Sequence, residues 1–215
     1  ISIRNLILPK TWGMALVEQL SDGSKYALKA GPFGSSLKKE FYVTKGYKIY
    51  GQEQVIRNDP NYGNYYIDDE RYDLLKSNSV RPGDILISLV GTIGKVLVLP
   101  DNIEPGIINP RLVKLSLNKN IVDSKYFKYY MESGYIQRYF DNISHGGTMK
   151  ILNLSIIKKT PIPIPPLDEQ KRIITELENK MSQIDEITIM ISKSMKRAEK
   201  FRAAILNQAF KGKLV

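Results

Sequence analysis

The stretch that decides the fold is Pro161-Ile162-Pro163-Ile164-Pro165-Pro166, which precedes a segment, residues 167–209, without Gly or Pro. Fixed φ angles and missing N–H donors make such a proline run extended and semi-rigid. Asp168 and Glu169 follow it, where carboxylates favour the positive end of a helix, and Gly212 ends the pattern. The sequence therefore predicts a boundary over 161–166 and one helix of about 65 Å over 167–209.

Apolar residues recur along this helix every seven residues in two rows, of which the second is interrupted by Thr188 and Arg202. This spacing is typical of a coiled-coil seam, and a lone helix would expose the whole stripe. A partner helix is therefore expected, either from a second copy or from sequence beyond Val215; the alternative is that the stripe packs on its own domain. The residues predicted to mediate dimerisation are Ile174, Leu177, Met181, Ile184, Ile191, Met195, Ala198 and Ile205.

The residues ahead of the proline run indicate an α/β (α+β) domain. Runs rich in β-branched residues and bounded by turn residues predict strands over 47–50, 84–89, 95–99 and 111–117. A helix is predicted over 124–142, with Ser124 as its cap. The expected organisation is a globular domain over 1–160, a connector over 161–166 and a long helix over 167–215.

Composition narrows the function. The chain has 215 residues, 42% hydrophobic and 25% charged, and its 32 Lys and Arg against 22 Asp and Glu give a net charge of +10. Such a charge indicates an anionic partner, nucleic acid first. With no cysteine and His145 as the one histidine, the sequence excludes disulfide frameworks, thiolate nucleophiles and zinc clusters. Because no apolar run reaches about 18 residues and residues 1–10 do not resemble a signal peptide, a cytoplasmic protein without membrane contact is predicted.

Three possible catalytic motifs do not hold. The run from Gly91 to Lys95 resembles a phosphate-binding loop but has Val96 in place of Ser or Thr, so a turn between two strands is predicted. The run from Asp59 to Tyr62 resembles the Asp-Pro-Pro-Tyr loop of amino-methyltransferases but lacks one proline, so an Asx-type turn is predicted. Asp101 and Asp123 match a loose metal-nuclease pattern without strand context. We therefore predict neither a catalytic nor a metal site.

Loops rich in glycine, hydroxyl and basic residues remain as binding candidates. Small residues allow backbone N–H groups to approach a phosphate, lysine adds charge, and Asn and Arg can bind base edges. A turn with solvated lysines explains the loop over 31–39 equally well, and a surface role explains His145. The predicted DNA-binding residues are Gly31, Gly34, Ser35, Ser36, Lys38, Lys39, Thr92, Lys95, Asn109, Arg111, His145, Gly146, Gly147, Thr148 and Lys150.

In its order of motifs the whole chain resembles a half-length specificity subunit of a bacterial or archaeal type I restriction-modification system. The proline run with the helix behind it is the most specific match, and the others are weak singly. The matching segments are Leu8–Trp12, Gly31–Ser35, Pro82–Leu86, Gly91–Lys95, Asn109–Arg111, Gly147–Thr148, Pro163–Gln170 and Ala209–Val215.

This resemblance implies a non-catalytic target-recognition domain that reads half of an interrupted site in double-stranded DNA. In the family, two conserved helices pair antiparallel as a spacer, methyltransferase subunits modify adenine N6 with S-adenosylmethionine, and restriction (motor-nuclease) subunits consume ATP and cut. S-adenosylmethionine, ATP and Mg would thus belong to partner subunits, and this chain would hold no cofactor.

The chain departs from the family in length, since a full subunit carries two recognition domains and two helices. Either two copies pair as a homodimer through the long helix, which we favour, or the sequence is a piece of a longer chain. A stand-alone dimeric DNA-binding protein is the second hypothesis, and a metal-dependent nuclease is the third.

Overall fold

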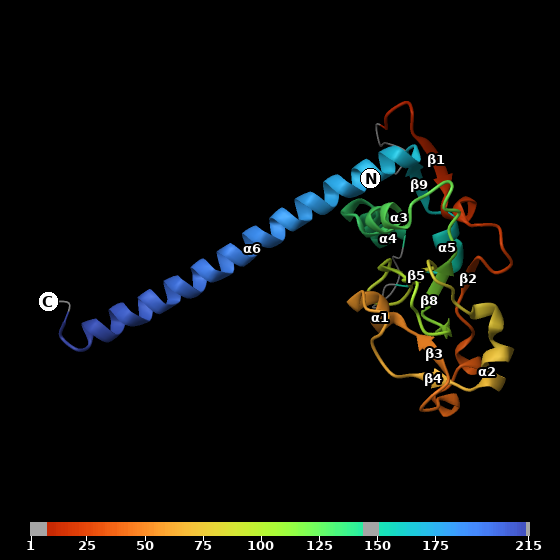
Figure 1. The fold of residues 1–215 in the computed structure, drawn as a ribbon, viewed down its shortest axis with the longest axis horizontal. Helices are drawn as coiled ribbons and strands as arrows, with labels where there is room; N and C mark the ends of the chain where they lie inside the picture. The colour runs from red at the N-terminus through yellow and green to blue at the C-terminus, as the bar shows by residue number, and fades with distance from the viewer. Residues whose placement is uncertain (1–7, 144–150, 214–215) are drawn as a thin grey trace. The chain divides into compact units, whose positions relative to one another are not determined.

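The computed structural model describes residues 8–143 and 151–213 (Figure 1). Residues 1–171 and 172–215 form two compact units, which are described separately. The first unit is a mixed α+β domain and the second continues a long helix, as the sequence predicts.

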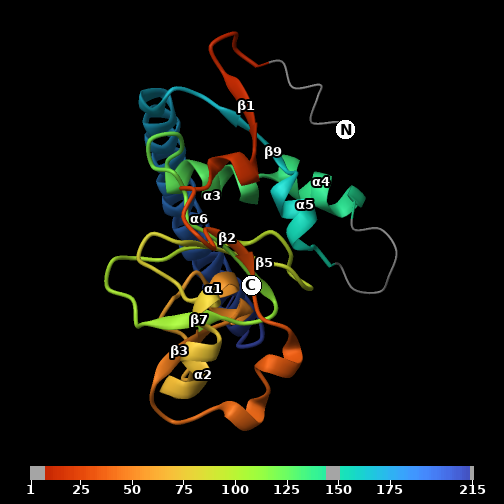
Figure 2. The ribbon, with the colours of Figure 1, turned by 90° about the vertical axis from the view of Figure 1, so that its right-hand side faces the viewer.

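The described part of the first unit contains three small sheets, with strand orders β1-β9, β2-β8-β5-β6 and β4-β3-β7. Neighbouring strands are antiparallel except β3 and β7, which are parallel. Figure 1 and Figure 2 both place the β1-β9 sheet at one end of this unit, the four-stranded sheet in the middle, and β3 with α2 at the other end. The strands are β1 Gly13–Leu16, β2 Leu28–Ala30, β3 Tyr47–Tyr50, β4 Tyr66–Ile67, β5 Ile85–Ser88, β6 Val96–Val98, β7 Gly106–Ile108, β8 Leu112–Leu115 and β9 Pro161–Ile164.

Helices cover these sheets. The α-helices are α1 Gln52–Arg57, α2 Asp69–Leu74, α3 Ser124–Glu132, α4 Gly134–Ile143, α5 Leu154–Lys158 and α6 Leu167–Ala209. The short 3-10 helices are η2 Val17–Leu20, η3 Gly34–Ser36, η4 Lys39–Phe41 and η5 Lys76–Asn78.

The main core lies on the four-stranded sheet. Every residue of β5 and β8 is buried, so both faces of the sheet are covered. On one face, Val55 of α1 packs with Leu86 and Leu97. At the β6 edge, Glu132 of α3 accepts a hydrogen bond from the Val96 N–H, 3.0 Å. A second cluster, which includes Ile49 and Ile107, lies on the β4-β3-β7 sheet.

The predicted strands and turns are confirmed, but the predicted helix over 124–142 is wrong in two respects. It consists of two helices, because Ser133 adopts an extended conformation between α3 and α4. Its cap is Asp123 rather than Ser124, since the Asp123 carboxylate accepts hydrogen bonds from the N–H groups of Lys125 and Tyr126. Aspartate is as favourable as serine at this position, and sequence alone does not separate two such neighbours.

The proline run forms a strand. Residues 161–164 pair antiparallel with β1, and the hydroxyl of Tyr126 in α3 donates to the Pro163 carbonyl, 2.8 Å. The hydroxyl of Tyr130 donates to the Pro161 carbonyl, 3.3 Å. Proline lacks an N–H group, and it is tolerated here because this sheet has only two strands, so both are edges. Strand β9 therefore brings the chain back to β1 immediately before α6 begins.

Gln170 ties the first turn of α6 into the first unit. Its side chain is fully buried, and its Nε2 donates to the carbonyl oxygens of Pro165, 2.9 Å, and Ile121, 3.0 Å. Its Oε1 accepts from the N–H of Asp123, 2.8 Å. The amide nitrogen and the amide oxygen of Gln170 thus both form hydrogen bonds with backbone groups, which only an amide side chain can do at once. This accounts for the glutamine in this segment.

Helix α6 has the predicted bounds and spans 43 residues. Both rows of the predicted seam are on its surface: Ile184 is 60% exposed, Ile191 55% and Met195 61%, whereas Ile174 is buried. No helix within the described residues combines the length and the apolar character needed to cross a membrane.

Candidate nucleic-acid interface

Segments that are far apart in the sequence meet at the N-terminal end of α1. The Gly31 N–H donates to the Leu112 carbonyl, 2.9 Å, and the Asn109 N–H donates to the Tyr50 carbonyl, 2.9 Å. The Leu89 N–H donates to the Arg111 carbonyl, 3.0 Å. The segments around Gly31, Gly91 and Asn109 are therefore neighbours in the folded chain.

Gly31 has a packing role. A Cβ atom at this position would collide with the backbone carbonyl of Asn109, which cannot move away without disturbing the turn. The Asn109 side chain is itself engaged, because its Oδ1 accepts from the N–H of Arg111, 2.9 Å. Gly34 differs, since nothing lies within 4 Å of its Cβ position.

We expect Gly31→Ala to lower the free energy of unfolding by about 1–3 kcal/mol, because the added methyl group overpacks a backbone contact. Gly34→Ala is the matched control and should leave stability nearly unchanged, as its Cβ position is open. Urea denaturation followed by circular dichroism measures both. Equal stability of the two variants would contradict the packing role of Gly31.

The connection from β5 to β6 carries the predicted glycine turn. Gly91 and Gly94 both have φ of +70°, which favours glycine. The Gln52 Nε2 of α1 donates to the Val90 carbonyl, 2.5 Å, whereas the Gln52 Oε1 is buried and accepts no hydrogen bond within the described residues. The side chain of Thr92 is exposed at the tip. This connection therefore lies against α1.

Basic residues gather at the C-terminal end of α1. Lys128 of α3 donates from Nζ to the Asn58 Oδ1, 2.5 Å. Burial lowers the pKa of Lys128 below its ordinary value, and Lys95 lowers it further, while Glu132 opposes the shift. The Arg57 guanidinium lies 4.2 Å from the centre of the Tyr62 ring. Lys95 and Lys128 lie close enough to interact, and Glu132 is the carboxylate that acts on Lys128. This pair of lysines forms a local positive charge to which a phosphate could bind.

These segments are neighbours around α1 through the backbone and side-chain contacts above, and we call their exposed and half-buried polar residues the α1 surface. Its cationic members are Arg57, Lys95, Arg111 and Lys128. The sequence predicts Lys95 and Arg111 as DNA-binding residues but does not predict Arg57 and Lys128, because no local motif marks an isolated basic residue on a helix. The α1 surface consists of Gln52, Arg57, Asn58, Thr92, Lys95, Arg111 and Lys128.

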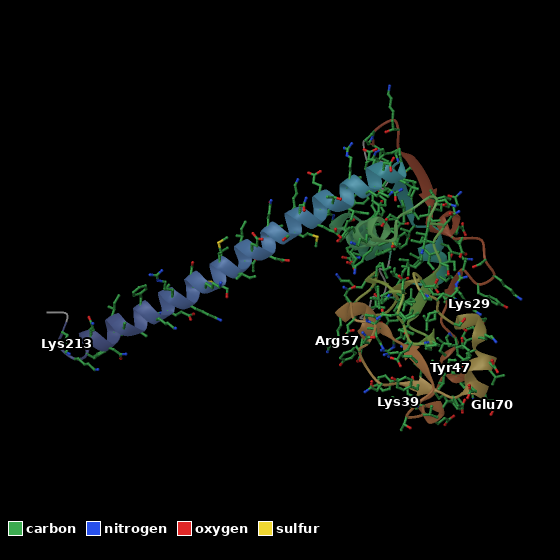
Figure 3. All side chains as sticks on the ribbon, in the orientation of Figure 1. Lys29, Lys39, Tyr47, Arg57, Glu70 and Lys213 are labelled. Atoms are coloured by element: carbon green, nitrogen blue, oxygen red, sulfur yellow. The ribbon has the colours of Figure 1, made fainter. Side chains whose placement is uncertain are left out.

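The remaining predicted residues of the first loop lie elsewhere. Lys38 forms an exposed ion pair with Glu40, 3.5 Å. In Figure 3, Lys39 lies away from Lys29 and Arg57, toward the end of the domain that carries Glu70 of α2. Gly34, Ser35 and Ser36 form η3 ahead of this segment. The structure thus brings Gly31, Thr92, Lys95, Asn109 and Arg111 together and leaves residues 34–39 apart from them.

Five predicted contacts, His145, Gly146, Gly147, Thr148 and Lys150, lie outside the described residues. They stay predictions.

The residues of the rejected catalytic motifs have structural roles. Asp123 caps α3, and Asp101 lies in an exposed turn. The Asp59 Oδ1 accepts from the N–H of Asn61, 2.9 Å, which confirms the predicted Asx-type turn. Within residues 8–143 and 151–213, no group of three or more His, Asp or Glu side chains is arranged to hold a metal ion.

A model of the type I restriction modification DNA specificity domain matches residues 33–198, which include the α1 surface and most of α6. The chain belongs to this family. The specificity subunit of the EcoBI type I restriction enzyme of Escherichia coli is 27% identical over 139 residues, 65% of this chain and 29% of that protein. A putative type I specificity subunit of Haemophilus influenzae is 32% identical over 148 residues, 66% of this chain and 37% of that protein.

Solved structures share the fold of this specificity domain. A chain from a study of complex assembly and conformational transition of the type I restriction-modification system has a TM-score of 0.70 at 19% identity, covering 99% of this chain and 49% of that one. The HsdS subunit of Thermoanaerobacter tengcongensis has a TM-score of 0.63 at 20% identity, covering 97% and 47%. The chain thus spans about half the length of these structures and, by sequence, about a third of the curated relatives.

Proposed function

We propose that this chain is a non-catalytic DNA-specificity subunit, which recognises one half of an interrupted target and positions adenine-N6 methyltransferase subunits there. The observation that carries the proposal is the match of the specificity-domain family over residues 33–198. The α1 surface adds a physical reason, since Arg57, Lys95, Arg111 and Lys128 carry positive charge on four neighbouring segments, and phosphates of a duplex bind such cations.

Helix α6 supplies the second half of the target by pairing two copies. Its charge is divided: residues 167–186 contain six acidic and three basic side chains, whereas residues 187–213 contain one acidic and seven basic. An antiparallel pair places the acidic half of one copy beside the basic half of the other, while a parallel pair places like charges together. The charges therefore favour an antiparallel homodimer, whose two-fold symmetry requires a palindromic interrupted target.

The chemistry belongs to partner subunits in this proposal. The methyltransferase subunits bring S-adenosylmethionine, the restriction subunits bring ATP and Mg, and this chain binds neither cofactor. Its own contribution is to hold the DNA and the methyltransferase in a fixed relation, with the helix length setting the spacing of the half-sites.

Stable co-purification with a type I methyltransferase subunit tests this role. With both proteins expressed together and a tag on this chain only, we expect the methyltransferase to elute with it in a constant ratio. A chain that binds DNA as a dimer but never retains the methyltransferase would instead be a stand-alone DNA-binding protein. Divalent-metal-dependent cutting of DNA by the chain alone would favour a nuclease.

A further inference from the structure

The segment from Asn58 to Tyr65, which joins α1 to β4, carries exposed polar side chains that take no part in the packing of the domain. Its sequence is Asn-Asp-Pro-Asn-Tyr-Gly-Asn-Tyr, with three side-chain amides in eight residues. We call it the Asn loop. It begins at the C-terminal end of α1, so it continues the α1 surface.

The backbone of the Asn loop is held from inside the domain. The Gln54 Nε2 donates to the Tyr62 carbonyl, 2.8 Å, and the Lys48 Nζ donates to the Asn61 carbonyl, 3.2 Å. Both donors are buried, Gln54 at 3% exposed and Lys48 at 1%. Two successive carbonyl groups are thus fixed by side chains from α1 and β3, which orders the loop before any ligand arrives.

The buried Lys48 has no spare charge for a ligand. Its Nζ forms an ion pair with Glu104, 2.7 Å, and this pairing lowers the pKa of the Glu104 carboxyl below its ordinary value. Glu104 also accepts a hydrogen bond from the Tyr66 hydroxyl, 3.2 Å. Lys48 therefore supports the loop and takes no part in contacting DNA.

The outward side of the loop presents unused amides. Asn61 and Asn64 are exposed, and neither side chain forms a hydrogen bond within the described residues. Asn58 is already engaged by Lys128, and Asp59 closes the turn of the loop. An asparagine amide can donate and accept at once, which is the arrangement that the major-groove edge of adenine requires.

Two cations lie at the base of the Asn loop. Arg57 is held on the Tyr62 ring at the base of the loop, and Lys128 contacts Asn58 at its start. Phosphate contacts position a protein on the duplex and base contacts specify the sequence, so exposed amides on an ordered loop with cations at its base meet both requirements. The acidic helix α2 begins only after the loop has passed through β4.

We propose that the Asn loop is a base-reading element of this chain, in which Asn61 and Asn64 bind base edges in the major groove while Arg57 and Lys128 hold the adjacent phosphates. The inference rests on the proposed function and assigns one or two positions of its sequence specificity to Asn61 and Asn64.

Selection of bound duplexes from a random-sequence pool, followed by sequencing, tests the assignment on the full-length chain. We compare the wild type, the double variant Asn61→Ala/Asn64→Ala, and Asn120→Ala, a control that removes an exposed turn asparagine outside the loop. Removing a bidentate hydrogen-bonded pair relaxes the preference at its base position about ten- to a hundred-fold. Thermal melting of each variant verifies that it is folded.

The expected result is a motif that loses one or two positions in the double variant, retains its other positions, and is unchanged in Asn120→Ala. The salt dependence of binding should stay as in the wild type, since no phosphate contact is removed. A double variant that selects the wild-type motif overturns the base-reading role and leaves the proposed function intact. A wild-type chain that selects no motif at all overturns both.

Discussion

Ile184→Asp and Ile191→Asp, each made singly, are expected to convert the proposed homodimer into a monomer. Both isoleucines lie on the predicted seam of α6 and are more than half exposed in the single chain, so a partner helix would bury them. In a two-fold dimer each substitution introduces two carboxylates near the helix midpoint, where they are desolvated and repel each other. We expect the dissociation constant to rise at least about a thousand-fold.

The same helix provides the control. Ile189 is 55% exposed, as Ile191 is, but lies outside both rows of the seam, on the opposite side of the helix. Ile189→Asp should therefore remain dimeric. Sedimentation equilibrium distinguishes the 24.5 kDa monomer from a species of twice that mass. Dimeric Ile184→Asp and Ile191→Asp variants would show that the seam is assigned to the wrong face.

Removing the cations of the α1 surface is expected to weaken DNA binding and to reduce its dependence on salt. The variants are Lys95→Gln, Arg111→Gln and Lys128→Gln. Each removed phosphate contact reduces the magnitude of the slope of log K against log salt by about 0.9. Glutamine keeps much of the side-chain length, so the half-buried stem of Lys128 is largely retained. The triple variant should therefore reduce the slope by about 2.7.

Lys76→Gln serves as the control, because Lys76 pairs with Asp73 at the end of the acidic helix α2, 3.7 Å. It should leave the slope unchanged. Lys38→Gln and Lys39→Gln test the loop that the sequence favoured. If these two change the slope and the α1-surface variants do not, DNA lies against η3 and η4 instead of α1.

The long helix was the most predictable part of this protein. Forty-three residues without Gly or Pro admit one regular element, and the bounds of α6 agree with that pattern. Strands β3, β5, β6 and β8 were also recognisable, because buried runs such as Ile85–Ser88 are bounded by turn residues, whereas the short strands β1, β2, β4 and β7 were not predicted. By contrast, the break at Ser133 was not predicted although Ser133-Gly134 is a dipeptide typical of turns, because the apolar pattern continues across it.

The candidate interface was only partly predictable. Glycines drew attention to the turns around residues 31 and 91, and Asn109 and Arg111 drew attention to a third segment; the three segments do meet at α1. However, the structure explains Gly31 by its contact with the Asn109 backbone, which local composition does not reveal. Arg57 and Lys128 come together through tertiary packing across 71 positions of the sequence, and nothing near either residue marks such a pair.

We propose above all that this chain sets the sequence at which a type I methyltransferase acts. A genome-wide map of N6-methyladenine tests it most directly, in cells that make this chain with its type I methyltransferase subunit and in cells that make the methyltransferase alone. We predict a new interrupted motif with palindromic halves in the first cells only; unlike halves would indicate a second recognition domain. No new motif, with both proteins present and soluble, would contradict the account.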